Sequence, residues 1–263
     1  PPRGMGLSIY LGVQDRHPSL RQVCEDRGVR LPAPLDPGAE GFVLESLADD
    51  VLVGIGSDSR GVLYAVGEIL RQTVARENRI ELATDLEVRA APRFRYRGTI
   101  AWQGHTITEL TGSRRWTEQE THDNYLNYAL AGANIFQISS AKDDPIYQLL
   151  RDYGLLTLTT INGNSGQGPP EWQAKEAIGR TGYLCPSVPE ARQALLEQRE
   201  KVFQNMPFHD VVRFKSGDGG GCECEKCQPY GGVFIRLCED YARALHKYHP
   251  DAVVFVGNQK LDN

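Results

Sequence analysis

The chain has 263 residues, and its 34 acidic side chains outnumber its 29 basic ones, which gives a formal net charge of −5. Without a basic excess to neutralise phosphates, we expect no nucleic acid as a partner. Apolar residues make up 40% of the chain and charged residues 24%, which is typical of a folded globular protein and argues against disorder. No apolar run approaches the ~20 residues that a membrane-spanning helix needs, so we expect no membrane span.

The first 91 residues are predicted to form a small α+β domain. Short segments rich in β-branched and aromatic residues, bounded by Gly and Pro, predict strands at residues 6–13, 41–45, 50–55 and 79–88. Capping residues and apolar side chains at helical spacing predict helices at residues 18–27 and 57–73. Pro92 interrupts this pattern, and we place a boundary there between domains of residues 1–91 and 92–263.

From residue 92 onward, strands and helices alternate. Strands are predicted at residues 94–102, 134–139, 155–161, 211–215 and 252–256. Capping boxes at Thr117 and Ser187, and a proline at Pro145, predict three of the intervening helices. The last helix is predicted from the apolar stripe of Phe234, Leu237, Cys238, Tyr241, Ala242 and Leu245. Such β-then-α steps predict an α/β fold with a parallel sheet, either doubly wound or part of a (β/α)8 TIM barrel. Because a whole barrel needs roughly 250 residues, we expect a truncated barrel of about five strands.

Several segments resemble the glycoside hydrolases of the β-hexosaminidase (family 20) and α-glucuronidase (family 67) type. In the domain that precedes their barrel, the matching pieces are EGFVLES (40–46), DVLVGIG (50–56), SRGVLYAVGEILRQ (59–72) and PRFRYRG (92–98). FKSGDGGG (214–221) with YGG (230–232) resembles the fourth barrel strand of family 67. With CECEKC attached, this segment is most similar to uncharacterised bacterial glycosidase-like proteins. The resemblance implies a glycosidase acting on poly- or oligosaccharides, and we expect it to be secreted or periplasmic.

Asp218 is the candidate catalytic acid. It follows the predicted fourth strand, where barrel enzymes place catalytic groups, and family 67 carries a Glu acid at this strand end. Hexosaminidases carry Asp-Glu there, whereas Gly219 follows Asp218 in this chain. The alternative is that Gly-Asp-Gly forms only a tight turn. We expect the second carboxylate of a glycosidase to lie beyond residue 263 and this piece alone to be inactive.

Other polar and aromatic side chains follow the predicted strands and are candidates for binding the sugar. Aromatic rings stack on sugar faces and amides bind hydroxyls. Trp102 also fits the aromatic residue that family 67 places after its first strand. Each candidate has a purely structural alternative. Trp102 would be a core aromatic residue, His105 a solvated loop histidine, and the amide side chains would cap loops. The candidates are Trp102, His105, Gln137, Asn162, Asn164 and Asn258.

Three cysteines, Cys222, Cys224 and Cys227, lie within six residues. Thiolates at this spacing can hold a structural zinc if a fourth ligand comes from elsewhere, for which His209, Cys185 and Cys238 are candidates. A disulfide with one free thiol, or three reduced structural cysteines, remain alternatives. Catalysis itself is expected to require no cofactor.

A second group of charges, Arg93, Arg95 and Arg97, alternates with aromatic residues. These arginines are predicted to pair with acidic residues at the domain junction, or alternatively to bind the carboxylate of a uronic acid. The overall hypothesis is a glycoside hydrolase. The alternative is a carbohydrate-binding protein that keeps the fold without catalysis, and Gly219 in place of the expected Glu favours this alternative. The oligomeric state is not predicted.

Overall fold

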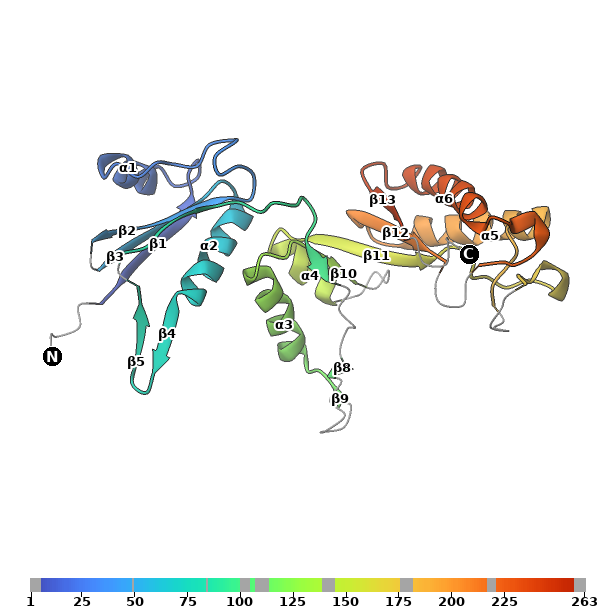
Figure 1. The fold of residues 1–263 in the computed structure, drawn as a ribbon, viewed down its shortest axis with the longest axis horizontal. Coiled ribbons are helices and arrows are strands. Elements are labelled where there is room, and N and C mark those ends of the chain that lie inside the picture. The colour runs from blue at the N-terminus through green and yellow to red at the C-terminus, as the bar shows by residue number, and fades with distance from the viewer. Residues whose placement is uncertain are drawn as a thin grey trace. The chain divides into compact units, whose positions relative to one another are not determined.

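The structure is a computed structural model that describes residues 6–48, 50–83, 85–99, 105–106, 114–138, 145–175, 182–216 and 221–257. The chain divides into two compact units, residues 1–136 with 149–155 and residues 137–148 with 156–263. Figure 1 labels the elements of both units along the chain. The predicted domain boundary at residues 91 and 92 stays a prediction.

A four-stranded mixed sheet forms the centre of the first unit. Its order is β1 (Ser8–Val13), β3 (Val51–Gly56), β2 (Phe42–Ala48) and β6 (Glu87–Ala90). Strand β1 runs parallel to β3, whereas β2 is antiparallel to both β3 and β6. The mixed α/β character that the sequence predicts is therefore confirmed.

Alternate residues of these strands face two separate apolar clusters, as the pleat of a strand requires. Leu44 and Leu52 pack with the buried side of α2 (Ser59–Arg71). Val43 and Val53, one position along in each strand, pack with Cys24 of α1 (Pro18–Asp26). The sheet thus contributes to cores on both of its faces.

Helix α2 also packs against α3 (Glu118–Leu130), and a glycine makes this approach possible. A Cβ atom on Gly67 would lie 1.9 Å from the carbonyl oxygen of Leu130, closer than any real contact. At its other end, α2 begins at Asp58, whose carboxylate accepts hydrogen bonds from the backbone N–H groups of Gly61 and Glu40. Helix α3 begins with the predicted capping box between Thr117 and Glu120.

The second sheet contains five strands in consecutive order. Where the register is given, β7 (Gly98–Thr99) is parallel to β10 (Ile135–Gln137), and β12 is parallel to both β11 and β13. This order is the one expected of a barrel segment and differs from a doubly wound sheet. Closure into a barrel stays a prediction. The remaining strands are β11 (Leu156–Asn162), β12 (Val211–Lys215) and β13 (Val253–Val256).

Two long helices of the second unit, α5 (Pro189–Asn205) and α6 (Tyr230–His246), enclose its core together with β12. The apolar stripe predicted for the last helix is buried at Phe234, Leu237 and Tyr241. A shorter helix, α4 (Pro145–Asp152), follows β10, and the chain leaves it through Gly154 in a left-handed conformation with φ of 66°.

Three details of the sequence prediction are wrong. Residues 79–88 are not one strand, because β5 (Arg79–Leu82) turns back on β4 (Thr73–Arg76) as a hairpin, and β6 joins the first sheet. Of the strand predicted at 94–102, residues 94–99 are described, and only the two residues of β7 among them form a strand. Ser187 does not cap α5, whose N-cap is Val188, because its hydroxyl faces a cysteine cluster instead. The remaining short elements are β8 (His105–Thr106), β9 (Arg114–Arg115), and the 3-10 turns η1 (Pro170–Trp172) and η2 (Glu225–Cys227).

Candidate functional site

The carboxyl ends of β11, β12 and β13 lie at one edge of the parallel sheet, where barrel and other α/β proteins place their ligands. Asp218, Trp102 and Asn258 fall outside the described residues, so their predicted roles stay predictions. His105 lies in the short strand β8, and its side chain also falls outside the description. Three of the predicted sugar-binding side chains can therefore be placed: Gln137, Asn162 and Asn164.

Gln137 is the last residue of β10, and its side chain points along the sheet to the next strand. Its Oε1 accepts a hydrogen bond of 2.8 Å from the hydroxyl of Thr160 in β11. This contact holds the amide at the carboxyl end of the strand, where the sequence analysis placed it. Whether Gln137 also binds a sugar stays a prediction.

Asn164 lies in the loop after β11 and is fully buried. Its Nδ2 donates hydrogen bonds to the backbone carbonyls of Leu184, at 3.3 Å, and Gly221, at 3.1 Å. Because these residues directly precede Cys185 and Cys222 in the chain, the amide fixes two loops beside each other. This contact is structural, and the predicted sugar contact of Asn164 stays a prediction.

Asn162 ends β11, and its backbone is held by α5. The carbonyl oxygen of Asn162 accepts a 2.9 Å hydrogen bond from Nη2 of Arg199 and a 3.1 Å bond from the hydroxyl of Ser165. Its own Oδ1 is buried and has no hydrogen-bond partner among the residues that the structure describes. An acceptor left in this state is compatible with the predicted role in binding a hydroxyl donor.

Two side chains that the sequence analysis did not single out hold this loop in place. The Arg199 guanidinium also donates to Ser165, and burial lowers the pKa of Arg199. The hydroxyl of Tyr241, fully buried in α6, donates a 2.7 Å hydrogen bond to the carbonyl of Gly163. Tyr241 belongs to the predicted apolar stripe, and Arg199 lies in a highly charged helix, so neither position carried a signal of this contact.

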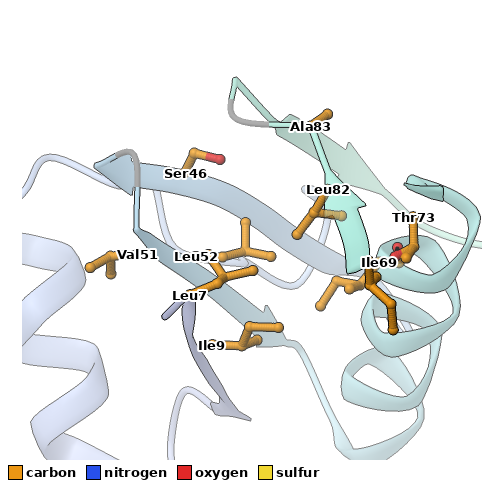
Figure 2. A pocket seen from close by; sticks show the side chains of 10 residues that line it. Leu7, Ile9, Ser46, Val51, Leu52, Ile69, Thr73, Leu82 and Ala83 are labelled. Carbon is orange, nitrogen blue, oxygen red and sulfur yellow. Dashed lines mark hydrogen bonds between the residues drawn. The ribbon is translucent and has the colours of Figure 1, made fainter. Parts of the chain in front are cut away.

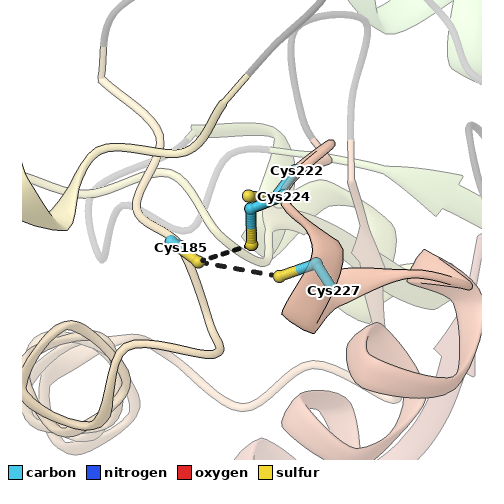
Figure 3. A group of neighbouring side chains, drawn as sticks. All are labelled: Cys185, Cys222, Cys224 and Cys227. Atoms are coloured by element: carbon cyan, nitrogen blue, oxygen red, sulfur yellow. Dashed lines mark hydrogen bonds between the residues drawn. The ribbon is translucent and has the colours of Figure 1, made fainter.

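Four cysteines gather at the loops that precede α5 and α6. The sulfur atoms of Cys185, Cys222, Cys224 and Cys227 all lie within 4.8 Å of one another. Figure 3 shows the Cys185 side chain pointing from one loop toward the other three, which lie in one short segment, residues 222–227. The Sγ atom of Cys185 lies 3.7 Å from that of Cys224 and 3.6 Å from that of Cys227.

Of the three fourth-ligand candidates, the structure brings Cys185 into the cluster. Cys238 is buried in the apolar stripe of α6, as the sequence predicts for a core residue. His209 is also buried, and its ring meets that of Tyr147 edge-on at a centroid distance of 5.9 Å. Neither side chain belongs to the cluster that Cys185, Cys222, Cys224 and Cys227 form.

Three of the four cysteines are buried, and this burial affects the pKa values of the thiols. Burial raises the pKa of Cys227 to about 11. A hydrogen bond with Cys185, together with burial, raises the pKa of Cys222, whereas the backbone N–H groups of Cys224 and Lys175 act in the opposite direction. The raised pKa values of Cys222 and Cys227 favour the protonated thiols unless a positive charge is bound beside them.

An apolar pocket of about 360 Å³ lies in the first unit (Figure 2). Hydroxyl groups come from Ser46 and Thr73, and aliphatic side chains form the rest of the lining. Without an acid, a base or an amide, this lining offers no group for glycoside chemistry. The pocket is also lined by Leu7, Ile9, Leu52, Ile69, Ile80 and Leu82.

Solved glycoside hydrolases share the fold of this chain. A family GH115 4-O-methyl-α-glucuronidase with specificity for decorated arabinogalactans is 15% identical, with a TM-score of 0.54 over 94% of this chain and 36% of its own. A Flavobacterium johnsoniae chitobiase is 14% identical, with a TM-score of 0.59 over 97% of this chain and 50% of its own. A GH20 exo-β-N-acetylglucosaminidase from Vibrio harveyi is 12% identical, with a TM-score of 0.58 over 97% of this chain and 55% of its own.

The chain thus spans from about a third to just over half of the length of these three enzymes. No protein-family model matches it, and no curated protein sequence does either. Among the described residues, no helix combines the length and apolar character that crossing a bilayer demands.

Proposed function

We propose that the full-length protein containing this chain is a glycoside hydrolase that cleaves O-glycosyl bonds in poly- or oligosaccharides. Residues 92–263 would form the first half of its TIM barrel. The observation that carries this proposal is the consecutive order of the strands β7, β10, β11, β12 and β13 after a mixed-sheet domain. The fold shared with α-glucuronidases and β-N-acetylglucosaminidases over almost the whole chain supports it.

In this proposal Asp218 is the general acid that protonates the oxygen of the leaving sugar. Strand β12 ends at Lys215, at the carboxyl edge of the sheet where barrel enzymes carry out chemistry, and Asp218 follows three positions later in the sequence. A second carboxylate, supplied from outside residues 1–263, would activate water or attack the anomeric carbon. Gln137 and Asn162 at the neighbouring strand ends would bind sugar hydroxyls, with Trp102, His105, Asn164 and Asn258 completing the site.

The alternative is a secreted or periplasmic carbohydrate-binding protein without hydrolytic activity. Gly219 favours it, because the Glu that hexosaminidases carry directly after the aspartate is absent from this chain. Loss of that carboxyl group would leave the sugar-binding amides and aromatic residues in place. Binding without turnover would separate this alternative from the hydrolase.

The test compares the full-length protein with its Asp218→Asn variant on chromogenic glycosides of glucuronic acid and N-acetylglucosamine. We expect turnover of one of these substrates by the parent. The variant should keep its fold and its sugar affinity while kcat falls ~10²–10⁴-fold, because general acid catalysis contributes about that factor. Glu225→Gln, at an exposed position in the same loop, serves as the control and should not change kcat.

Two outcomes would contradict the proposal in different ways. A parent that binds sugars but turns over none of them would favour the carbohydrate-binding alternative. If turnover is present and Asp218→Asn keeps kcat within about threefold of the parent, Asp218 is a turn residue. In that case Glu223, the next carboxylate along the loop, becomes the residue to replace.

A further inference from the structure

We propose that Cys185, Cys222, Cys224 and Cys227 bind one zinc ion through four thiolates, and that this ion joins the loop before α5 to the loop before α6. The proposal does not depend on the hydrolytic activity, because it concerns cysteine side chains to which the proposed hydrolysis assigns no part. It rests on the positions of the four sulfur atoms, on the contacts that fix the two loops, and on the nature of the neighbouring donors.

The sulfur positions agree with a tetrahedron around zinc. A Zn–S bond of about 2.3 Å in a regular tetrahedron places neighbouring sulfur atoms about 3.8 Å apart. Cys185 Sγ lies 3.7 and 3.6 Å from the sulfur atoms of Cys224 and Cys227, and all four atoms lie within 4.8 Å. A disulfide would need about 2.05 Å between two of them, so these spacings favour a shared ion over a covalent pair.

The backbone around the cluster is already held in place by contacts that involve no metal. The amide of Glu223 donates a 2.6 Å hydrogen bond to the carbonyl of Lys175, and the amide of Cys185 donates a 2.8 Å bond to that of Trp172. Asn164 connects the residues preceding Cys185 and Cys222, as described above. Four ligands from two loops therefore meet with little rearrangement.

Hydrogen-bond donors surround the sulfur atoms, as is usual for bound thiolates. The Ser187 hydroxyl lies 3.0 Å from Cys227 Sγ, and backbone N–H groups of Cys224 and Lys175 face Cys222. Buried thiolates need such donors because the charge of the zinc ion offsets only part of theirs. Soft thiolate ligands in a tetrahedral set select zinc or iron, whereas calcium and magnesium require oxygen ligands.

The position of the centre gives it a structural purpose. The described residues between 163 and 188 contain little regular secondary structure, with η1 as their longest element, and Cys185 lies near the end of this range. Cys222 follows Asp218 by four positions in the sequence. A bound ion would join the end of the 163–188 segment, just before α5, to the residues that follow Asp218 and precede α6.

The experiment measures metal in the whole chain, purified without chelator and under reducing conditions. Elemental analysis should give close to one zinc per chain, and Cys224→Ser should lose it. Cys224 is the least buried of the four, which makes this variant the one most compatible with folding. Cys24→Ala, at a buried cysteine of the first unit, is the matched control and should keep the full zinc content.

Cobalt supplies a second readout that requires no variant. Replacing the bound metal by Co²⁺ should produce the thiolate charge-transfer and intense d–d absorption of a tetrahedral sulfur site, and added zinc should abolish both. A wild-type chain without metal, one that binds iron instead, or a disulfide between any two of the four cysteines found by mass spectrometry would overturn the proposal. Zinc retained in Cys224→Ser would also overturn the four-ligand assignment.

Discussion

Arg97 and Glu40, 57 positions apart in the sequence, form an ion pair in which both side chains are largely buried, with exposed fractions of 18% and 13%. The same guanidinium donates a 2.9 Å hydrogen bond to the hydroxyl of Tyr64. Asn134 donates to the Glu40 carboxylate at 3.1 Å, and Arg60 lies 2.8 Å from it. Arg97 therefore pairs with an acidic residue, as predicted for this group of arginines, and the predicted place of such a pair at a domain junction stays a prediction.

This network leads to a prediction for Glu40→Gln. The variant removes the charge that two arginines and an amide surround, and it leaves the Arg97 guanidinium partly buried without its counter-ion. Breaking a buried pair by removing one partner costs about 3–5 kcal/mol, and the partial exposure here reduces our expectation to about 2–4 kcal/mol. Urea denaturation followed by circular dichroism measures the change in the free energy of unfolding.

The control for this prediction is Glu81→Gln. Glu81 pairs with Arg76 and Arg79 in the exposed β4–β5 hairpin, where solvent screens the charges. Exposed pairs contribute roughly 0–1 kcal/mol, so the control should stay within that range. Equal losses for both variants would show that the Glu40 pair contributes no more than a surface contact.

Tyr64 gives the same network a pH dependence. Burial, and then the neighbouring Glu40 carboxylate, raise the pKa of Tyr64 to about 12, against an ordinary value near 10. Between these values the unfolded chain loses the phenolic proton while the folded chain keeps it. The contribution of Tyr64 is therefore fully present below pH 10 and is lost as the pH rises toward 12, by about 2 kcal/mol.

The measurement for Tyr64 is the free energy of unfolding at several pH values between 9 and 12. Other buried tyrosines and cysteines also titrate there, so the quantity of interest is the difference between the parent and Tyr64→Phe. The variant starts from a lower stability because Arg97 loses an acceptor, and we expect its curve to fall less steeply. Parallel curves would mean that the Tyr64 proton is lost equally in both states.

Tyr241→Phe tests the loop at the end of β11. The substitution keeps the aromatic ring in the core but removes the donor to the Gly163 carbonyl, which then lies buried without that partner. An unsatisfied buried group costs about 1–3 kcal/mol, and we expect a loss in that range by thermal or urea denaturation. In the full-length protein, sugar affinity should also fall if Asn162 binds the substrate.

Tyr248→Phe is the matched comparison for Tyr241. The Tyr248 hydroxyl contacts Glu200 and Gln204 at the surface, where water can replace it. We therefore expect a change within about 0.5 kcal/mol. A loss for Tyr241→Phe no larger than this would show that the Gly163 carbonyl finds another donor.

The sequence located most elements correctly because their signals are local. The capping box of Thr117 and Glu120, the stripe of α6 and the alternating strands β11 and β12 depend on neighbours a few residues away. Where the prediction was wrong, the outcome depended on distant partners. Ser187 has the sequence of a helix cap, yet its hydroxyl contacts Cys227, 40 positions further along the chain.

By itself, the sequence determined the mixed α/β class, the order of most strands and helices, and the set of cysteines from which a metal site could be built. Only the tertiary structure decided that Cys185, rather than His209 or Cys238, joins Cys222, Cys224 and Cys227. The choice depends on hydrogen bonds that hold two loops together across about 40 residues of chain. No local spacing encodes such contacts, because their partners lie far apart in the sequence and meet only in the folded chain.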